Sequence, residues 1–465
     1  MNLRTKAIQG GTFLLIRQAF GIVISVVGVL LVTRIIGPRQ YGLFAAGAGI
    51  VTFLYMFGAW GLDVCLLRKT EDPEEKEFHQ AFTLLLPIAV GLCIGVFALR
   101  HIIAAFLKMP EESSLLMLLA LGIPLNLLAL PAIVKLDRDL NFKQVAINEL
   151  ISQIGYYVIA VPLAFRGFGA WAPAVGFLTR QVTLLTLSYW AARFRPGLHW
   201  EAKLIKQMVG YGLSYSSSIW VYQLRRLVNP LIVGRFAGAE AVGYVAVCVR
   251  IVEMISFASS ATWRLAMPAF AKLNRDPARL RNAISEGMRF QTVAVGFPLA
   301  SFVLLAPFLF PLGFGHHWMS AVKLFPLVAL GYFSNVVFNL HSCVLYMLEK
   351  NMQVTWFHLI HVTLFAGSAM LLVPTLGFIG YGWAEVVSVF SNVVIHMFLE
   401  RAVGSPSYAA PAIWYATAVA VIVLGSLGAP ALYFGFLIIF TPLFFRKERT
   451  TLAGYAQVLF SRVSA

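Results

Sequence analysis

Five arginines of this sequence lie inside long apolar stretches, where a charged side chain is rare. They are Arg17, Arg180, Arg225, Arg226 and Arg250. A guanidinium group stays charged in a low-dielectric cavity, and its fork of N–H donors fits the oxygens of a phosphate group. These arginines are therefore candidates to bind an anion such as a diphosphate.

The acids available to the arginines leave a second interpretation open. Between Glu149 and Glu240 the only Asp or Glu is Glu201, so three of the five arginines have no acid within their own stretch. Those three could still pair with Glu149, or with Glu253 or Glu385 from another stretch. Such pairs would make the arginines structural and not substrate-binding.

The remaining two arginines have their own structural alternatives. Arg250 has Glu253 three positions further on, and this spacing places both side chains on one face of a helix, where they can form an ion pair. Arg17 lies close to the start of its apolar stretch, so its long side chain can extend to the membrane surface.

Further polar residues inside apolar stretches are candidates for ion coupling or for a polar cavity, and these are Glu253, Glu385, Asn229, Asn335 and Asn339. Hydrogen bonding between helices is the other role open to them. We expect no metal site, cofactor or catalytic residue. The four cysteines have neither C-x-x-C spacing nor a paired histidine, and the phosphate-binding motif G-x-x-x-x-G-K-[ST] is absent.

Composition explains why apolar stretches are so common. The chain of 465 residues is 59% hydrophobic and only 12% charged, whereas soluble proteins are about 25% charged. Most of the surface must therefore face lipid. The net charge of +16 then indicates basic cytoplasmic loops and not a nucleic-acid partner.

The apolar runs predict an all-α protein with about fourteen transmembrane helices, because a spanning helix needs about 20 apolar residues. The runs cover residues 12–36, 43–67, 81–106, 115–136, 147–165, 169–192, 211–233, 241–267, 288–310, 322–348, 354–374, 378–399, 409–425 and 429–445. Most of the 36 Lys and Arg residues lie at one set of ends, to which both chain termini belong. Both termini are therefore predicted to be cytoplasmic.

A repeated motif indicates that the chain is built from two similar halves. The pattern R-x-x-G-x-x-x-x-G occurs in "RIIGPRQYG" from Arg34 and again in "RFAGAEAVG" from Arg235. Each copy is expected to form an outer loop between two helices. We predict six-helix lobes at 1–200 and 201–400, related by an axis along the membrane normal around a central cavity, with two more helices and a cytoplasmic tail at 401–465.

The segments around these motifs resemble a known family. "LLVTRIIGPRQYGLFAA", "KLDRDLNFKQVA", "FRGFGAWAPAVGF" and "PLIVGRFAGAEAVGY" are similar to Wzx-type flippases of the multidrug/oligosaccharidyl-lipid/polysaccharide exporter superfamily, in the exopolysaccharide or colanic-acid subgroup. The resemblance implies a fold like that of the superfamily's multidrug exporters. It also implies an undecaprenyl-diphosphate-linked oligosaccharide as substrate, moved to the periplasmic leaflet of a bacterial inner membrane by alternating access. Implied partners are membrane lipids, a polysaccharide polymerase and export machinery.

Two other functions are compatible with a chain of this composition. A cation-coupled small-molecule exporter of the same superfamily would share the fold, but a surplus of arginines favours an anionic substrate. A membrane glycosyltransferase or polymerase would need carboxylates to hold a metal ion. The predicted outer loops contain only Glu111, Glu112 and Glu240, and the D-x-D of Asp137–Asp139 stands alone.

Overall fold

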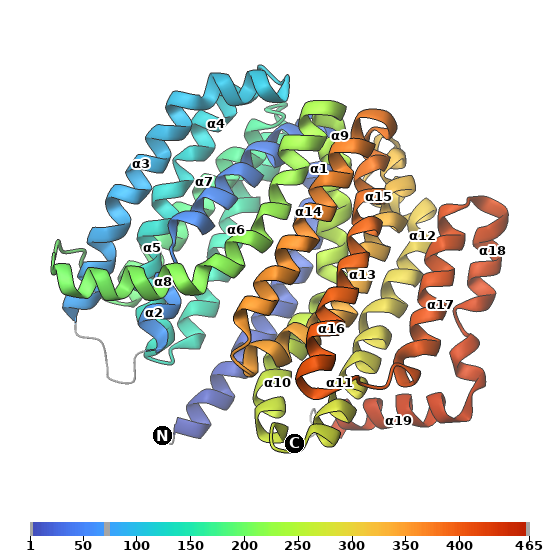
Figure 1. The fold of residues 1–465 in the computed structure, drawn as a ribbon. Coiled ribbons are helices and arrows are strands. Elements are labelled where there is room, and N and C mark those ends of the chain that lie inside the picture. The colour runs from blue at the N-terminus through green and yellow to red at the C-terminus, as the bar shows by residue number, and fades with distance from the viewer. Residues whose placement is uncertain (1–2, 69–74, 462–465) are drawn as a thin grey trace. The chain divides into compact units, whose positions relative to one another are not determined.

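The computed structural model describes residues 3–68 and 75–461, and within these ranges the chain is helical without a β-strand (Figure 1). This confirms the predicted all-α class. The main helices are α1 (Leu3–Gly58), α2 (Leu62–Arg68), α3 (Glu75–Leu107), α4 (Glu112–Ala120), α5 (Gly122–Arg138), α6 (Phe142–Phe165), α7 (Trp171–Ala191), α8 (Ala202–Gln223), α9 (Gly234–Ile255), α10 (Phe257–Leu273), α11 (Pro277–Gln291), α12 (Phe297–Gly313), α13 (Met319–Met347), α14 (Asn351–Leu376), α15 (Phe378–Ser388), α16 (Asn392–Val403), α17 (Ala409–Ser426), α18 (Ala429–Ile438) and α19 (Arg446–Ser461).

The helices have the lengths and hydropathy of a multi-pass membrane protein. In the described part of the chain, nine helical stretches are long and apolar enough to cross a bilayer, and two shorter apolar helices cover Pro411–Ser426 and Ala431–Phe444. The number of fourteen crossings stays a prediction. Some stretches, such as Phe20–Gly58, join parts of two predicted spans across a bend.

The contacts divide the chain into two compact units. Unit 1 comprises Met1–Ala246, Gly313–His317 and Ala369–Phe378, and unit 2 comprises Val247–Leu312, Trp318–Ser368 and Ile379–Ala465. In unit 1, α6 packs along α7 and also against α1, while α3 packs on α4 and α5. In unit 2, α13 contacts α10, α11, α16 and α17. The predicted boundaries at 1–200, 201–400 and 401–465 stay a prediction.

In each copy of the repeated motif two helices meet directly at a bend, at the position where a loop between two helices was predicted. Gly37 interrupts α1 with φ 75° and ψ 172°, and Gly238 interrupts α9 with φ 84° and ψ 177°. Only glycine adopts this backbone conformation readily. One such residue redirects the chain and lets helical hydrogen bonding resume at once, so no separate loop is required. The same conformation in both copies agrees with a duplicated element.

The two bent segments also contact one another reciprocally inside unit 1. A Cβ atom added to Gly42 would lie 1.7 Å from the carbonyl oxygen of Ala239, and one added to Gly243 would lie 2.2 Å from that of Pro38. Gly42 and Gly243 occupy matching positions of the motif, as do Pro38 and Ala239. Reciprocal contacts of this kind are what a local two-fold axis between the two copies produces.

The arginines that open the two motifs follow the same reciprocal pattern. Arg235 donates from Nη1 to the carbonyl oxygen of Phe106 at 2.8 Å, at the end of α3, and its guanidinium carbon lies 5.4 Å from the centre of the Phe106 ring. A Cβ on Gly315, just after α12, would lie 3.9 Å from Cγ of Arg34. Each arginine thus packs at the end of a long helix that follows the other copy.

Candidate functional site

Two of the predicted site arginines lie where a helix of unit 1 loses its regular geometry. After α8, residues Leu224–Leu227 form a 3-10 turn and Val228–Val233 form a π-helical turn, before α9 begins at Gly234. Pro230 lies inside the π turn, where it has no N–H to donate. Short 3-10 and π segments inside longer helices often occur at functional positions.

Adjacent positions place Arg225 and Arg226 in different surroundings. Arg225 is buried with 7% of its surface exposed, donates to the hydroxyl of Tyr222 at 3.4 Å and has its guanidinium carbon 5.6 Å from the centre of the same ring. Arg226 is exposed and donates from Nε to Oε1 of Gln223 at 2.7 Å. Consecutive residues of a 3-10 turn project about 120° apart, so the two guanidinium groups do not share one position.

The other predicted residues of unit 1 differ in accessibility. Arg180 is exposed on α7. Nδ2 of Asn229 donates to the carbonyl oxygen of Val242 at 3.4 Å, which ties the irregular turn to α9. Arg17 lies outside the residues whose side chains the structure describes. Within unit 1 the structure therefore supplies one buried and two exposed arginines as candidates to bind the predicted anion.

The remaining predicted residues belong to unit 2. Arg250 is exposed and Glu253 is half-buried on α9, and their pairing stays a prediction. Glu385 on α15 is buried with 0% exposure.

Two asparagines of α13 are the most informative predicted residues of unit 2. Both side-chain polar atoms of Asn335 are buried and have no hydrogen-bond partner among the described residues. Asn339, one turn further along α13, accepts a hydrogen bond from Nε2 of Gln291 at 3.0 Å. Asn335 therefore offers a donor and an acceptor that no described residue engages.

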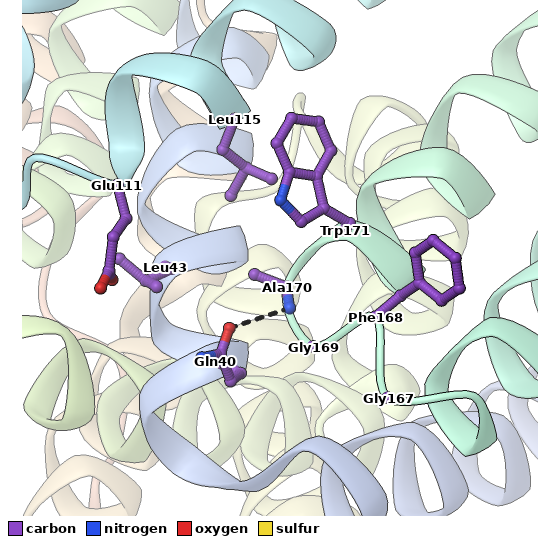
Figure 2. A pocket seen from close by; sticks show the side chains of 9 residues that line it. All are labelled: Gln40, Leu43, Glu111, Leu115, Gly167, Phe168, Gly169, Ala170 and Trp171. Carbon is purple, nitrogen blue, oxygen red and sulfur yellow. Dashed lines mark hydrogen bonds between the residues drawn. The ribbon is translucent and has the colours of Figure 1, made fainter.

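A cavity of about 290 Å³ opens at one end of unit 1, and sequence reasoning did not find it. Figure 2 shows its lining, which is Gln40, Leu43, Glu111, Leu115, Gly167, Phe168, Gly169, Ala170 and Trp171. Oε1 of Gln40 accepts a hydrogen bond from the backbone N–H of Ala170 at 3.0 Å. Glu111 is held by Arg39 at 2.9 Å, and both side chains are exposed. The bend of α1 and the turn before α7 thus frame a polar pocket.

Glu112, which follows the cavity residue Glu111 in the sequence, was predicted to lie in an outer loop but is buried in the structure. It is 0% exposed, and neither carboxylate oxygen has a hydrogen-bond partner among the described residues. The missing side chain of Gly47 makes room for it, because a Cβ there would lie 2.4 Å from Oε1. An isolated carboxylate is costly to bury in ionised form. No pattern around Glu112 distinguished it from the exposed Glu111.

Two buried polar networks of unit 2 were also not predicted from the sequence. Glu448 of α19 binds Arg289 of α11 at 2.5 Å and accepts from the indole N–H of Trp414 at 2.8 Å. The hydroxyl of Tyr408 lies 2.9 Å from Nε2 of His341 and 2.6 Å from Nδ1 of His396. Each network joins segments that are far apart in the sequence.

The family of the chain is shown by direct comparison. The family described as "Polysaccharide biosynthesis protein" matches residues 31–323, which is more than half of the chain. The chain belongs to this family. The match includes both copies of the repeated motif, and the resemblance stated from those motifs is confirmed.

Curated relatives of this polysaccharide biosynthesis protein have related names. It is 26% identical to the succinoglycan biosynthesis transport protein ExoT of Rhizobium meliloti (strain 1021), over 65% of this chain and 62% of the relative. It is 23% identical to the lipopolysaccharide biosynthesis protein WzxC of Escherichia coli (strain K12), over 71% of this chain and 68% of the relative. The match thus spans just under two thirds of ExoT's length.

Solved structures identify the fold of this family member. The lipid II flippase MurJ in an inward closed conformation has a TM-score of 0.72 at 13% identity, with 95% of this chain and 99% of that chain covered. An inward-facing multidrug resistance MATE transporter has a TM-score of 0.58 at 15% identity, with 84% and 94% covered. The predicted fold of the superfamily's exporters is confirmed, although the likeness at this identity concerns the fold alone.

Proposed function

We propose that the protein is a flippase that moves an undecaprenyl-diphosphate-linked oligosaccharide across a bacterial inner membrane by alternating access. It supplies repeat units for an exopolysaccharide or O-antigen-type polymer, and it acts as a transporter and not as an enzyme. The observation that carries the proposal is membership of a polysaccharide biosynthesis family together with a helical, membrane-spanning fold that MurJ shares.

The charges of the protein support an anionic substrate. Arg180, Arg225 and Arg226 lie in one unit, and Arg225 is buried beside the Tyr222 hydroxyl. The lipid chain of the substrate can remain in the bilayer, whereas the diphosphate must cross its centre. A buried guanidinium lowers that cost by charge-assisted hydrogen bonds. Arg250 and Arg17 are proposed as further contacts.

A cation-coupled small-molecule exporter is the alternative function, and one observation favours ion coupling. Glu112 is a buried acid without a hydrogen-bond partner in the described part of the chain, and a transporter that couples to a proton could use such a group. Proton coupling is compatible with either substrate. The excess of Lys and Arg over Asp and Glu, 36 against 20, opposes a cationic cargo.

We also propose the orientation of the protein in the membrane and its functional partners. Most basic residues lie at the ends that include both termini, which supports cytoplasmic termini under the positive-inside rule. A flippase delivers its substrate to the outer leaflet, where a polymerase must consume it. Polymerase and export machinery are therefore proposed as the functional partners, alongside membrane lipids.

The arginine pair provides the test of this function in cells. The double variant Arg225→Ala/Arg226→Ala should abolish polysaccharide export in cells that lack the native protein, whereas the double lysine variant should retain part of it. Losing one charge-assisted contact weakens binding about ten- to a hundred-fold. Arg166→Ala, at an exposed position after α6, is the control.

The result depends on the amount of protein in the membrane, which immunoblotting must show to be equal. Full export by the double alanine variant at wild-type abundance would exclude these arginines from substrate binding. Loss of export together with loss of the protein from the membrane would assign them a structural role.

A further inference from the structure

A second cavity, of about 270 Å³, lies within unit 2, and none of the five predicted site arginines lines it. It is lined by Ser259, Ser260, Trp263, Arg264 and Asn339. The first four belong to α10, and Asn339 belongs to α13, which packs against α10. Ser259–Arg264 lie in the later half of the predicted span 241–267, and Asn339 lies in the later half of the predicted span 322–348. Both spans are predicted to end on the cytoplasmic side, so the cavity lies nearer that side in the predicted topology.

The lining is unusual in the number of hydrogen-bond donors that the protein leaves unused. Serine and threonine in helices commonly donate to the carbonyl oxygen one turn earlier, and Thr262 does so to Ala258 at 2.8 Å. Neither Ser259 nor Ser260 has a side-chain hydrogen bond to any described residue. Their hydroxyl groups are therefore available to a ligand.

Asn339 presents a donor to the same cavity. Its Oδ1 atom accepts the hydrogen bond from Gln291 at 3.0 Å, and its Nδ2 group donates to none of the described residues. Gln291 is itself buried with 0% exposure, so it fixes the orientation of the amide. The Nδ2 group of Asn339 is therefore available to donate to a ligand.

Arg264 supplies the positive charge. The sequence contains no Asp or Glu between Glu253 and Asp276, and Arg264 has no ion pair with any residue that the structure describes. Two arginines of α11 behave differently, since Arg279 pairs with Asp276 at 3.2 Å and Arg289 pairs with Glu448. The guanidinium group of Arg264 can therefore bind an external anion.

Trp263 adds an aromatic wall. Its ring is held edge-on by Tyr346, with the ring centres 6.2 Å apart and the planes at 74°. An indole offers an apolar face and one N–H donor, which suits the alternating C–H and O–H groups of a sugar ring. The cavity volume of about 270 Å³ is slightly below the roughly 300 Å³ at which the usual range of ligand sites begins, so the cavity fits a head group and not a long chain.

We propose that this cavity is the cytoplasmic loading site, in which Arg264, Ser259 and Ser260 bind the phosphate groups and Trp263 and Asn339 bind the first sugar of the lipid-linked substrate. The inference rests on the proposed flippase function and adds a site to it. A phosphate group could also come from an anionic phospholipid, so the test has to separate these two sources.

Binding to the purified protein in nanodiscs tests the site without requiring transport. The probes are undecaprenyl diphosphate carrying one hexose, undecaprenyl diphosphate alone, and phosphatidylglycerol as competitor. Arg264→Ala should weaken binding of both diphosphates about tenfold or more, and Arg264→Lys should restore part of it. Trp263→Ala should weaken only the hexose-bearing probe. Arg275→Ala, an exposed arginine after the same helix, is the matched control and should change neither.

The possible results separate the site from the function. Equal binding by Arg264→Ala and the unaltered protein would overturn the site and leave the flippase proposal standing. Equal weakening by Arg275→Ala would overturn it as well, because general surface charge would then explain binding. Competition by phosphatidylglycerol at equal affinity would assign the cavity to membrane lipid and overturn the substrate role. Failure of the unaltered protein to bind either diphosphate would contradict both proposals.

Discussion

At the scale of single residues, the buried pair of Arg289 and Glu448 is expected to stabilise unit 2. The side chain of Arg289 is 5% exposed and that of Glu448 is 10% exposed. Arg289→Gln leaves the carboxylate buried without its charged partner, and breaking such a pair costs about 3–5 kcal/mol. The midpoint of thermal unfolding of the detergent-purified protein should fall clearly.

Arg279→Gln is the matched control, because it removes an exposed ion pair from the same helix. The side chains of Arg279 and Asp276 are 78% and 48% exposed, and exposed pairs contribute about 0–1 kcal/mol. Similar unfolding midpoints for the two variants would show that the buried pair contributes no more than the exposed one.

Tyr408 gives a prediction for alkaline pH. Burial, and to a smaller extent the nearby Glu400 carboxylate, raises the pKa of Tyr408. The neutral phenol is thus favoured in the folded state. Its contribution to stability is complete below the pKa of an unfolded tyrosine, about 10, and is lost as the pH rises further.

The variant Tyr408→Phe should have two effects. It should lower the unfolding midpoint at neutral pH, because His341 and His396 lose a hydrogen-bond partner. It should also lose less stability than the wild type between about pH 9 and pH 11, because these values lie on either side of the pKa of an unfolded tyrosine. An identical alkaline loss in both proteins would contradict the role of the Tyr408 hydroxyl.

Residue types were more predictable than their surroundings. An arginine in an apolar stretch was recognisable, but the burial of Arg225 and the exposure of Arg226 depend on an irregular turn. Arg289 and Glu448 are 159 positions apart, so only the packing of α11 and α19 brings them together. The hydrogen-bond donors around Arg264 likewise could not be predicted as a site, because serine and asparagine are common in helices.

At the scale of elements, the bent helices depend on the close contact between their glycines. Gly42→Ala would place a methyl group 1.7 Å from the backbone oxygen of Ala239, and a backbone atom cannot move aside as a side chain can. Overpacking costs about 1–3 kcal/mol or more. We expect less folded protein, measured by size-exclusion chromatography of detergent-solubilised membranes.

Gly91→Ala is the control for this prediction. No heavy atom lies within 4 Å of a Cβ built at Gly91, and alanine favours a helix more than glycine does. This variant should be at least as stable as the wild type. Equal yields of both variants would contradict the proposed contact between the motif copies.

The sequence predicted a junction between two helices at each copy of the motif, and the structure has a bend at a single glycine there in place of a longer loop. Glycine and proline indicate a turn, and their presence alone does not say whether helical hydrogen bonding resumes beyond it. The conformation of Gly37 and Gly238 leaves the helix on both sides intact. Contacts between the copies could not be read from spacing, because they depend on tertiary packing.

At the scale of the whole molecule, the predicted orientation can be tested by cysteine labelling. The four native cysteines, three of which are buried, are first replaced by alanine. Arg166→Cys, predicted to be outside, should react with an impermeant thiol reagent in spheroplasts, and Arg275→Cys should react only after lysis. Both positions are exposed in the structure. The reverse pattern would contradict cytoplasmic termini.

The most direct test of the flippase proposal is translocation by the purified protein in liposomes. Undecaprenyl diphosphate carrying one fluorescent hexose is placed in both leaflets, and an impermeant quencher reports the outer pool. We expect the protein to expose the inner pool much faster than it is exposed in protein-free liposomes, and we expect Arg225→Ala/Arg226→Ala to slow this exposure. Exposure no faster than in empty liposomes, together with uptake of a cationic dye, would contradict the flippase function and favour a small-molecule exporter.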